Sequence, residues 1–155
     1  NEPFNANGIS ISKVKRVSLD AGSHFDHYRS TYKPFIRPGQ SVPLAAAVGL
    51  KKVSGEQIEA NPAGAWLAKW EKVEKNSGTQ GVAMIVEPKA FEKQAEDKLN
   101  LLLVTKVPAS NEAQWWAGFC WDKAGQFTSL DAWKKHVDEF AQGLASPIEV
   151  SVTSQ

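Results

Sequence analysis

The 155-residue sequence is poor in several features that would define a class of function. Cys120 is its only cysteine, which excludes an internal disulfide and a structural zinc site made of several thiolates. Eighteen basic residues nearly balance seventeen acidic ones, so no excess of cations is available to displace the counterions of nucleic acid. No apolar run approaches the roughly 18 residues of a membrane-spanning helix. We therefore predict neither a nucleic-acid partner nor a membrane span.

Sequence signatures of common enzymes and cofactor sites are also missing. We find no nucleophile elbow, phosphate-binding loop, dinucleotide fingerprint or His-Glu-x-x-His sequence, and we predict no cofactor and no metal. Cys120 lies in the apolar run "WWAGFCW" without a histidine or acid close by, which favours a buried, inert thiol. The chain begins at Asn1 without a signal-peptide pattern, which we interpret as a processed or truncated start.

The residues that are present indicate a single folded domain over residues 1–155. Apolar residues make up 42% of the chain, enough for a core at this length. Alternating apolar and polar residues, or short apolar runs, predict strands at 10–19, 25–32, 41–51, 65–74, 81–86, 99–107, 113–122 and 148–153. Residues 65–74 would also suit a short helix, but their flanking Gly and Asn favour a strand. We expect a loop at 55–64, a helix or irregular loop at 89–97, and a hairpin over 99–122.

One amphipathic helix follows the strands. Trp133, Val137, Phe140 and Leu144 recur at helical spacing and form one apolar face. Thr128 with Asp131 resembles a capping box, and Gly143 and Pro147 mark the exit. The fold class predicted from these elements is mainly β, an antiparallel β-sandwich with one C-terminal amphipathic helix.

Three stretches together resemble a known family: "VSLDAGSHFDHYRSTY", the "AVGL" strand, and "WWAGFCWDKAGQFTSLDAWKKHVDEFAQGLASPIEVSV". They are similar to the C-terminal part of bacterial, mostly exported proteins that carry a domain of unknown function. These proteins often accompany pectin- and rhamnogalacturonan-degrading enzymes. The resemblance runs from about residue 14 to residue 152. Its pattern appears at Trp116-Ala117-Gly118, Trp121, Gly125, Phe127, Trp133 and Ser146-Pro147-Ile148-Glu149-Val150.

The resemblance implies a context rather than a reaction. Family members look like the large β-sandwiches of mutarotases and polysaccharide lyases, and they are more than twice as long as this chain. We therefore expect the chain to be the later half of a longer protein, with a missing N-terminal half or a companion chain. The expected partner is a polysaccharide or oligosaccharide, and the expected location is secreted or periplasmic.

The stretch "SLDAGSHFDHYRSTY" at residues 18–32 holds the candidate catalytic residues. Cleavage of a uronic-acid polymer by elimination needs a base, an acid for the leaving oxygen, and a cation to stabilise the enolate. The candidate bases are His24 and His27, the candidate acids are Tyr28 and Tyr32, and the candidate cations are Arg29 and Lys33. An extended strand would place His27 with Arg29 on one face, and His24, Tyr28 and Tyr32 on the other. This hypothesis requires His24 or His27, Tyr28 and Arg29 to converge in one cleft.

An ordinary structural role is the alternative for the same stretch, with histidines at a strand edge and tyrosines packed with wet hydroxyl groups. A metal site of His24, His27 and a neighbouring acid is the weaker reading, because the stretch looks extended. His136 is predicted to be a surface histidine on the helix.

The six tryptophans suggest a second hypothesis, a non-catalytic domain that binds glycan. Exposed Trp faces stack on sugar rings. Trp115 and Trp116 must point to opposite faces of a strand, so one is a candidate for exposure. We name Trp115, Trp116 and Trp121 as candidate contacts for saccharide. Trp133, and in the structural alternative Trp121, are predicted to lie in the core.

Overall fold

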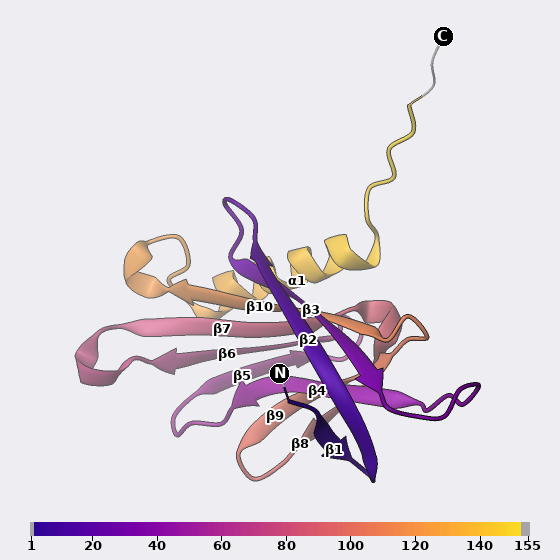
Figure 1. Cartoon of the computed structure of the whole chain (residues 1–155). Helices are drawn as coiled ribbons and strands as arrows, with labels where there is room; N and C mark the ends of the chain where they lie inside the picture. Colours follow the sequence, from indigo (N-terminus) through magenta and orange to yellow (C-terminus); the bar gives the residue numbers. More distant parts are fainter. Residues whose placement is uncertain (1, 153–155) are drawn as a thin grey trace.

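The computed structural model describes residues 2–152, which form two antiparallel β-sheets, one α-helix and three short 3-10 turns (Figure 1). The large sheet has seven strands, in the spatial order β1 (Phe4–Ala6), β2 (Ile9–Leu19), β3 (Phe25–Pro34), β10 (Glu112–Trp121), β7 (Thr79–Val86), β6 (Trp66–Lys72) and β5 (Gln57–Asn61). The small sheet has the order β4 (Leu44–Lys51), β9 (Asn100–Val107) and β8 (Phe91–Glu96). The helix is α1 (Leu130–Ala145), and the 3-10 turns are η1 (Glu74–Asn76), η2 (Pro88–Ala90) and η3 (Asp122–Ala124). The predicted antiparallel β-sandwich with one C-terminal helix is confirmed.

Both faces of the large sheet are covered over its central strands, and each face has its own core. One core lies under α1 and includes Trp66, Ile85, Trp133 and Val137. The other lies under the small sheet and includes Leu67, Val86, Leu103 and Trp115. The large sheet is therefore the middle layer of three, and the buried residues of its central strands enter one core or the other.

Strand β10 shows how the sequence produces this arrangement. It lies in the middle of the sheet and pairs with both β3 and β7. Successive side chains of a strand point to opposite faces, so Ala113 and Trp115 enter the core under the small sheet while Cys120 enters the core under α1. Gly118 also faces α1, where a Cβ atom would overlap the ring of Phe25. The prediction that Trp115 and Trp116 point to opposite faces is confirmed.

Helix α1 begins one residue later than its predicted capping box. Ser129 is the N-cap, and its side chain accepts a hydrogen bond from the backbone N–H of Ala132 at 3.3 Å. The Thr128 cap was therefore wrong, whereas the predicted apolar face is confirmed: Trp133 and Val137 are fully buried. None of the helices in residues 2–152 is both long and apolar enough to cross a membrane.

Two segments that were predicted without strands form edge strands. The expected loop at 55–64 contains β5, which pairs only with β6 and leaves Ile58 exposed. The charged segment 89–97 contains η2 and then β8, which pairs only with β9. Charged side chains are tolerated on an edge strand because one of its sides faces solvent. That tolerance weakens the apolar alternation, which is why the pattern did not reveal these strands.

One predicted pairing and one predicted strand are also wrong. Residues 99–122 do not form a hairpin, because β9 pairs with β4 in the small sheet whereas β10 pairs with β3 in the large one. The connection crosses from one layer to the other through Asn111, which has a positive φ of 59°. The predicted final strand is absent over residues 148–152, where Ile148 and Val152 are each 92% exposed. Thr153, the last residue of that prediction, lies outside the described residues.

We predict that Trp133→Ala will lower the free energy of unfolding by about 3–5 kcal/mol, because a fully buried indole is replaced by a cavity. Chemical denaturation followed by circular dichroism will measure the change. Leu99→Ala, at a side chain in the loop before β9 that is largely exposed, is the control and should change stability by less than about 0.5 kcal/mol. Equal effects of the two substitutions would contradict the assignment of Trp133 to the core.

Candidate functional site

Five side chains gather on the α1 side of the large sheet, at the margin of the part that the helix covers. Arg16 on β2 is directly opposite Arg29 on β3, and Arg29 is opposite Gln114 on β10. The next row places His27 opposite Trp116. Because directly opposed residues of antiparallel strands point to the same face, these five residues form one surface. We call Arg16, Arg29, His27, Gln114 and Trp116 the arginine strip.

The histidine of the arginine strip is held rigidly. The His27 ring stacks on the indole of Trp116, with ring centroids 4.6 Å apart and planes 8° from parallel. His27 Nε2 lies 3.0 Å from Oε1 of Gln114. The indole in turn meets the ring of Phe140 on α1 edge-on at 6.4 Å. These contacts fix the orientation of His27 beside Arg29.

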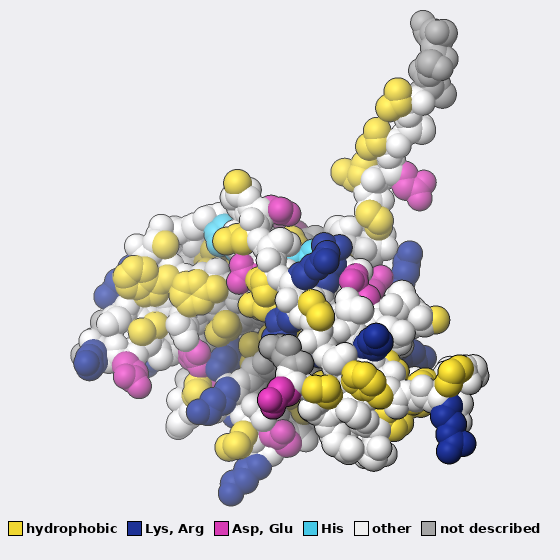
Figure 2. Space-filling view, in the orientation of Figure 1, with side chains coloured by type: hydrophobic (Ala, Val, Ile, Leu, Met, Phe, Trp, Pro, Cys, Tyr) yellow, Lys and Arg dark blue, Asp and Glu magenta, His cyan; other side chains and the backbone are white. Residues whose placement is uncertain are grey.

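The two arginines carry positive charge without a counter-charge. Both side chains are exposed, and neither forms an ion pair with an acid within residues 2–152. Like charges directly opposite each other destabilise a pair of strands. Figure 2 shows basic side chains beside a histidine where β2 and β3 pass in front of α1. An anion bound between the two guanidinium groups would remove this repulsion and accept hydrogen bonds from both.

Glu112 is an acid on the same face, where it is opposite Thr31 and accepts a hydrogen bond from the Thr31 hydroxyl group at 3.4 Å. Lys33 follows Thr31 two positions further along β3, also on this face, and its side chain is exposed. This face is therefore basic at Arg16 and Arg29 in the arginine strip and at Lys33 beyond it, and acidic at Glu112.

The predicted catalytic residues do not converge. Tyr28 lies on the opposite face of the sheet from His27 and Arg29, with its ring stacked on Trp115 at 5.8 Å. Lys15 Nζ lies 5.6 Å from the centre of the Tyr28 ring. Tyr32 also packs against the core under the small sheet, and burial raises the pKa of its hydroxyl group, with an opposing effect from a hydrogen bond to Ser30. The sheet thus separates both candidate acids from the candidate base and cation.

His24 was predicted on the face of Tyr28 and Tyr32, and this is wrong. It precedes β3, and its ring meets Phe127 and His136 edge-on at 5.0 and 5.1 Å, on the α1 side. Its Nε2 lies 3.1 Å from Oε1 of Gln126. His24 does not follow the alternation of β3, because it lies in a bend before Phe25, the first residue of that strand to pair with β10.

His136 is not the surface histidine that the sequence predicted. Its ring lies among Phe25, Phe127 and Trp133, with centroid distances of 5.6, 4.9 and 5.8 Å. Its Nε2 is buried and has no hydrogen-bond partner among the residues that the structure describes. Burial lowers the pKa of His136, the neighbouring His24 lowers it further, and Glu139 opposes the shift.

The three candidate tryptophans occupy different environments. Trp115 is 6% exposed, and Trp116 is half-buried with one face covered by His27. Trp121 is 41% exposed, so it is not the core residue of the structural alternative. Its Nε1 donates to the carbonyl of Ser77 at 2.9 Å, and it lies on the face opposite the arginine strip. Trp121 is therefore the most exposed of the three rings, and Lys123 Nζ lies 5.9 Å from its centre.

Cys120 is the buried, inert thiol that was predicted. It is 5% exposed in the core under α1, and burial raises its pKa to about 11. At neutral pH the side chain is therefore a neutral thiol, which is neither a nucleophile nor a metal ligand. Among residues 2–152 no group of three His, Cys, Asp or Glu side chains is arranged to hold a metal ion.

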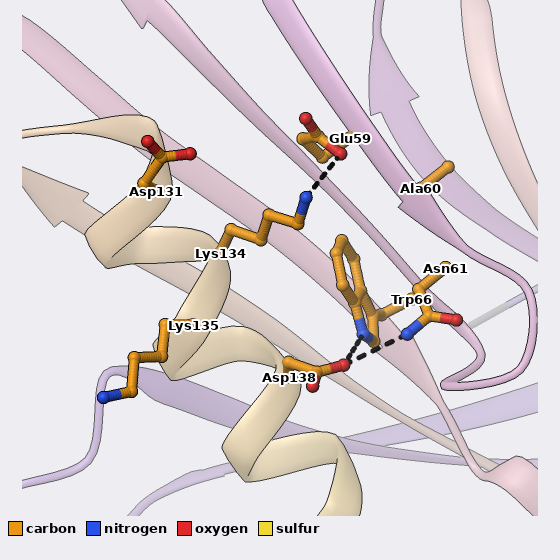
Figure 3. A pocket seen from close by; sticks show the side chains of 8 residues that line it. All are labelled: Glu59, Ala60, Asn61, Trp66, Asp131, Lys134, Lys135 and Asp138. Atoms are coloured by element: carbon orange, nitrogen blue, oxygen red, sulfur yellow. Dashed lines mark hydrogen bonds and ion pairs between the residues drawn. The ribbon is translucent and has the colours of Figure 1, made fainter.

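A cavity of about 480 Å³ lies between α1 and the edge formed by β5 and β6, and sequence reasoning missed it (Figure 3). Asp138 on α1 accepts hydrogen bonds from Trp66 Nε1 and Asn61 Nδ2, both at 3.1 Å, and from Gln142 Nε2 at 2.8 Å. Lys134 forms an ion pair with Glu59 at 3.0 Å. These polar groups bond to one another, so the hydrogen bonds and the ion pair that line the cavity hold α1 against β5 and β6.

A buried charge cluster on β6 was also missed. The side chain of Lys69 is 5% exposed and forms ion pairs with Glu71 at 2.6 Å and Glu56 at 3.2 Å. It also donates to the carbonyl of Lys51 at 2.7 Å. Alternation placed Lys69 on the correct face, but the sequence does not reveal that the small sheet and its connections cover it.

A family model described as "Domain of unknown function (DUF4861)" matches residues 1–150. The chain belongs to this family. A protein of Formosa agariphila named "Uncharacterized protein P7" is 31% identical over 156 residues, which cover 96% of this chain and 37% of that protein. The DUF4861 chain thus spans little more than a third of its relative. No solved structure matches it.

We predict that Asp138→Ala in this DUF4861 domain will lower the free energy of unfolding by about 1–3 kcal/mol. The substitution leaves the indole N–H of the buried Trp66 without an acceptor. Thermal or urea unfolding will measure the loss. Glu139→Ala, at an exposed acid 3.8 Å from Lys135, is the matched control and should change stability by less than about 0.5 kcal/mol. A loss of stability no greater than that of the control would contradict a stabilising role for the Asp138–Trp66 hydrogen bond.

We predict that His136 makes the domain less stable in mild acid. Its pKa is lower in the folded protein than in the unfolded chain, so the unfolded chain binds more protons as the pH falls below about 6.5, and stability falls with it. Above that pH both states are neutral at this position and the contribution is constant. Urea unfolding between about pH 5 and pH 7.5 should give a shallower pH dependence for His136→Phe than for the wild-type protein. An unchanged slope in His136→Phe would contradict the prediction.

Proposed function

We propose that this DUF4861 domain binds acidic saccharide through the carboxylate groups of uronic-acid residues. The arginine strip is the proposed site, with Arg16 and Arg29 as the carboxylate clamp. The observation that carries the proposal is the pair of exposed arginines directly opposite each other without an acid to neutralise them. A planar carboxylate matches the forked guanidinium group, because two N–H groups can donate to its two oxygens in parallel.

The groups beside the clamp suit a sugar. Gln114 and His27 line the strip next to Arg29 and offer hydrogen-bonding groups to hydroxyls. Trp116 serves this site by holding His27 in place, since its ring face toward β3 is already occupied. Exposed, uncovered arginines also suit a polymer, because a long chain can reach them without entering an enclosed pocket.

The larger setting of the proposal rests on the resemblance to exported bacterial proteins of pectin and rhamnogalacturonan degradation. In this proposal the domain is secreted or periplasmic, and it works together with further polypeptide, either the remainder of a longer chain or a companion chain. The share of the Formosa agariphila protein that it spans, 37%, supports such a division. Any catalytic step of the whole protein would then use groups outside this domain.

A lyase-type cleavage is the second candidate, and one observation favours it. His27 and Arg29 lie on the same face two positions apart, so a base stands beside a cation that can stabilise an enolate. Tyr28 cannot be the acid of this site, because it faces the small sheet. The candidate therefore requires an acid other than Tyr28 and Tyr32, whereas binding requires no further group, and binding is the function that we favour.

We predict that Arg16→Ala and Arg29→Ala will each weaken the binding of an oligogalacturonate about tenfold, since each removes about 1.4 kcal/mol or more of charge-assisted hydrogen bonding. Isothermal titration calorimetry at low salt will measure the affinity. Arg37→Ala removes an equally exposed arginine in the loop after β3 and is the matched control, expected to bind like the wild-type protein.

A neutral galactose oligomer of the same length should bind far more weakly than the uronate, because it lacks the carboxylates. Equal weakening by Arg37→Ala and Arg29→Ala would mean that binding depends on overall charge, which would contradict the proposed site. In parallel, the absorbance of unsaturated uronide products tests for cleavage. Product formation that is lost in His27→Gln would favour the lyase candidate over binding alone.

A further inference from the structure

A second surface of the domain lies on the face opposite α1. Four apolar side chains are exposed there: Val17 by 53%, Leu19 by 63%, Phe119 by 54% and Trp121 by 41%. They come from β2 and β10, where the alternation places them on the same face as Trp115. We call these four residues the apolar patch. Figure 2 shows hydrophobic side chains gathered over the adjoining ends of β10 and β7.

The apolar patch lies on the same face of the large sheet as the core under the small sheet, beyond the area that the small sheet covers. The small sheet buries Trp115, Leu67 and Val86, whereas Val82 and Met84 on β7 are only partly buried at its margin. Phe119 is opposite Val82 in the next strand, so the patch extends this margin outward. Three strands cover a sheet of seven, and the uncovered end remains apolar.

Such a cluster of aromatic and aliphatic side chains is expected at an interface rather than on a free surface. Single exposed apolar residues are common, but here four lie on one sheet face, two on β2 and two on β10, with β3 between the two strands. Polar groups adjoin them: Trp121 is opposite Gln80, whose amide donates to the Glu71 carboxylate at 2.6 Å. An apolar centre with a polar margin is the usual composition of a docking surface.

We propose that the apolar patch is the docking surface for the remainder of the longer DUF4861 polypeptide, which would add a second apolar layer beside the small sheet. The length of the relative supports this occupant, since the stretch that matches this chain makes up only 37% of it. A layer from that remainder would complete the cover that the small sheet begins. The inference is independent of saccharide binding, because the arginine strip lies on the other face of the sheet.

Cysteine labelling tests the proposal. Leu19→Cys and Phe119→Cys place thiols in the patch, and the native thiol of Cys120 stays silent because it is buried with a pKa of about 11. A maleimide probe is applied to each variant alone and with the part of the Formosa agariphila protein outside its matched stretch, expressed separately. We expect that polypeptide to slow labelling of both patch thiols at least tenfold.

Phe35→Cys is the matched control, because Phe35 is 56% exposed and lies outside the patch in the segment after β3. Its labelling should be equally fast in both conditions. Equal labelling of all three variants with and without the added polypeptide would overturn the proposal. Protection that appears in the chain alone as its concentration rises would assign the patch to a second copy, and protection by oligosaccharide alone would assign it to sugar; either result would also overturn it.

Discussion

The two-residue period of strand β10, hydrogen-bonded between β3 and β7, is the constraint on which the rest of the structure depends. Its buried side chains enter both cores, so each of them must suit either the helix or the small sheet. Trp115 and Trp116 are adjacent in sequence and belong to different layers. A one-residue slip would exchange these layers and bury polar side chains such as Gln114 under the small sheet.

The same period organises the proposed function. It places His27 and Arg29 together on β3 and sends Tyr28 to the other side of the sheet. Residues that look like one cluster in the sequence are therefore divided between two faces with different roles. The α1 side carries an uncovered, basic strip that suits anions, and the opposite side carries an apolar patch that suits protein.

The fold class and most strands could be predicted from the pattern of apolar residues. Some strands alternate apolar and polar residues, and core strands such as β7 and β9 are apolar runs with little interruption. The edge strands β5 and β8 could not, since an edge tolerates polar residues on both faces. The partners of β9 and β10 could not either, because strand pairing across layers depends on contacts distant in sequence. Of the candidate site, the shared face of His27 and Arg29 was predictable. Arg16 was missed because only the register of β2 against β3 brings it opposite Arg29.

Lys69 and His136 are more buried than their sequence context indicates. Lys69 and His136 lie where local patterns place them, but layers that are formed by distant segments cover both. Each is accommodated differently: Lys69 is paired with two acids, whereas His136 is held neutral among aromatic rings. Arg16 and Arg29, in contrast, are neither covered nor paired within the described residues, which is why we place the binding function there rather than at the buried charges.

The central claim is that carboxylate binds between Arg16 and Arg29. The most direct measurement is an NMR titration of the isotope-labelled domain with an oligogalacturonate, following backbone and arginine side-chain signals. The account predicts saturable shifts that begin at Arg16 and Arg29 and extend to His27 and Gln114, with the Trp121 signal unchanged. Shifts centred on Trp121, or none at the two guanidinium groups at saturating ligand, would contradict it.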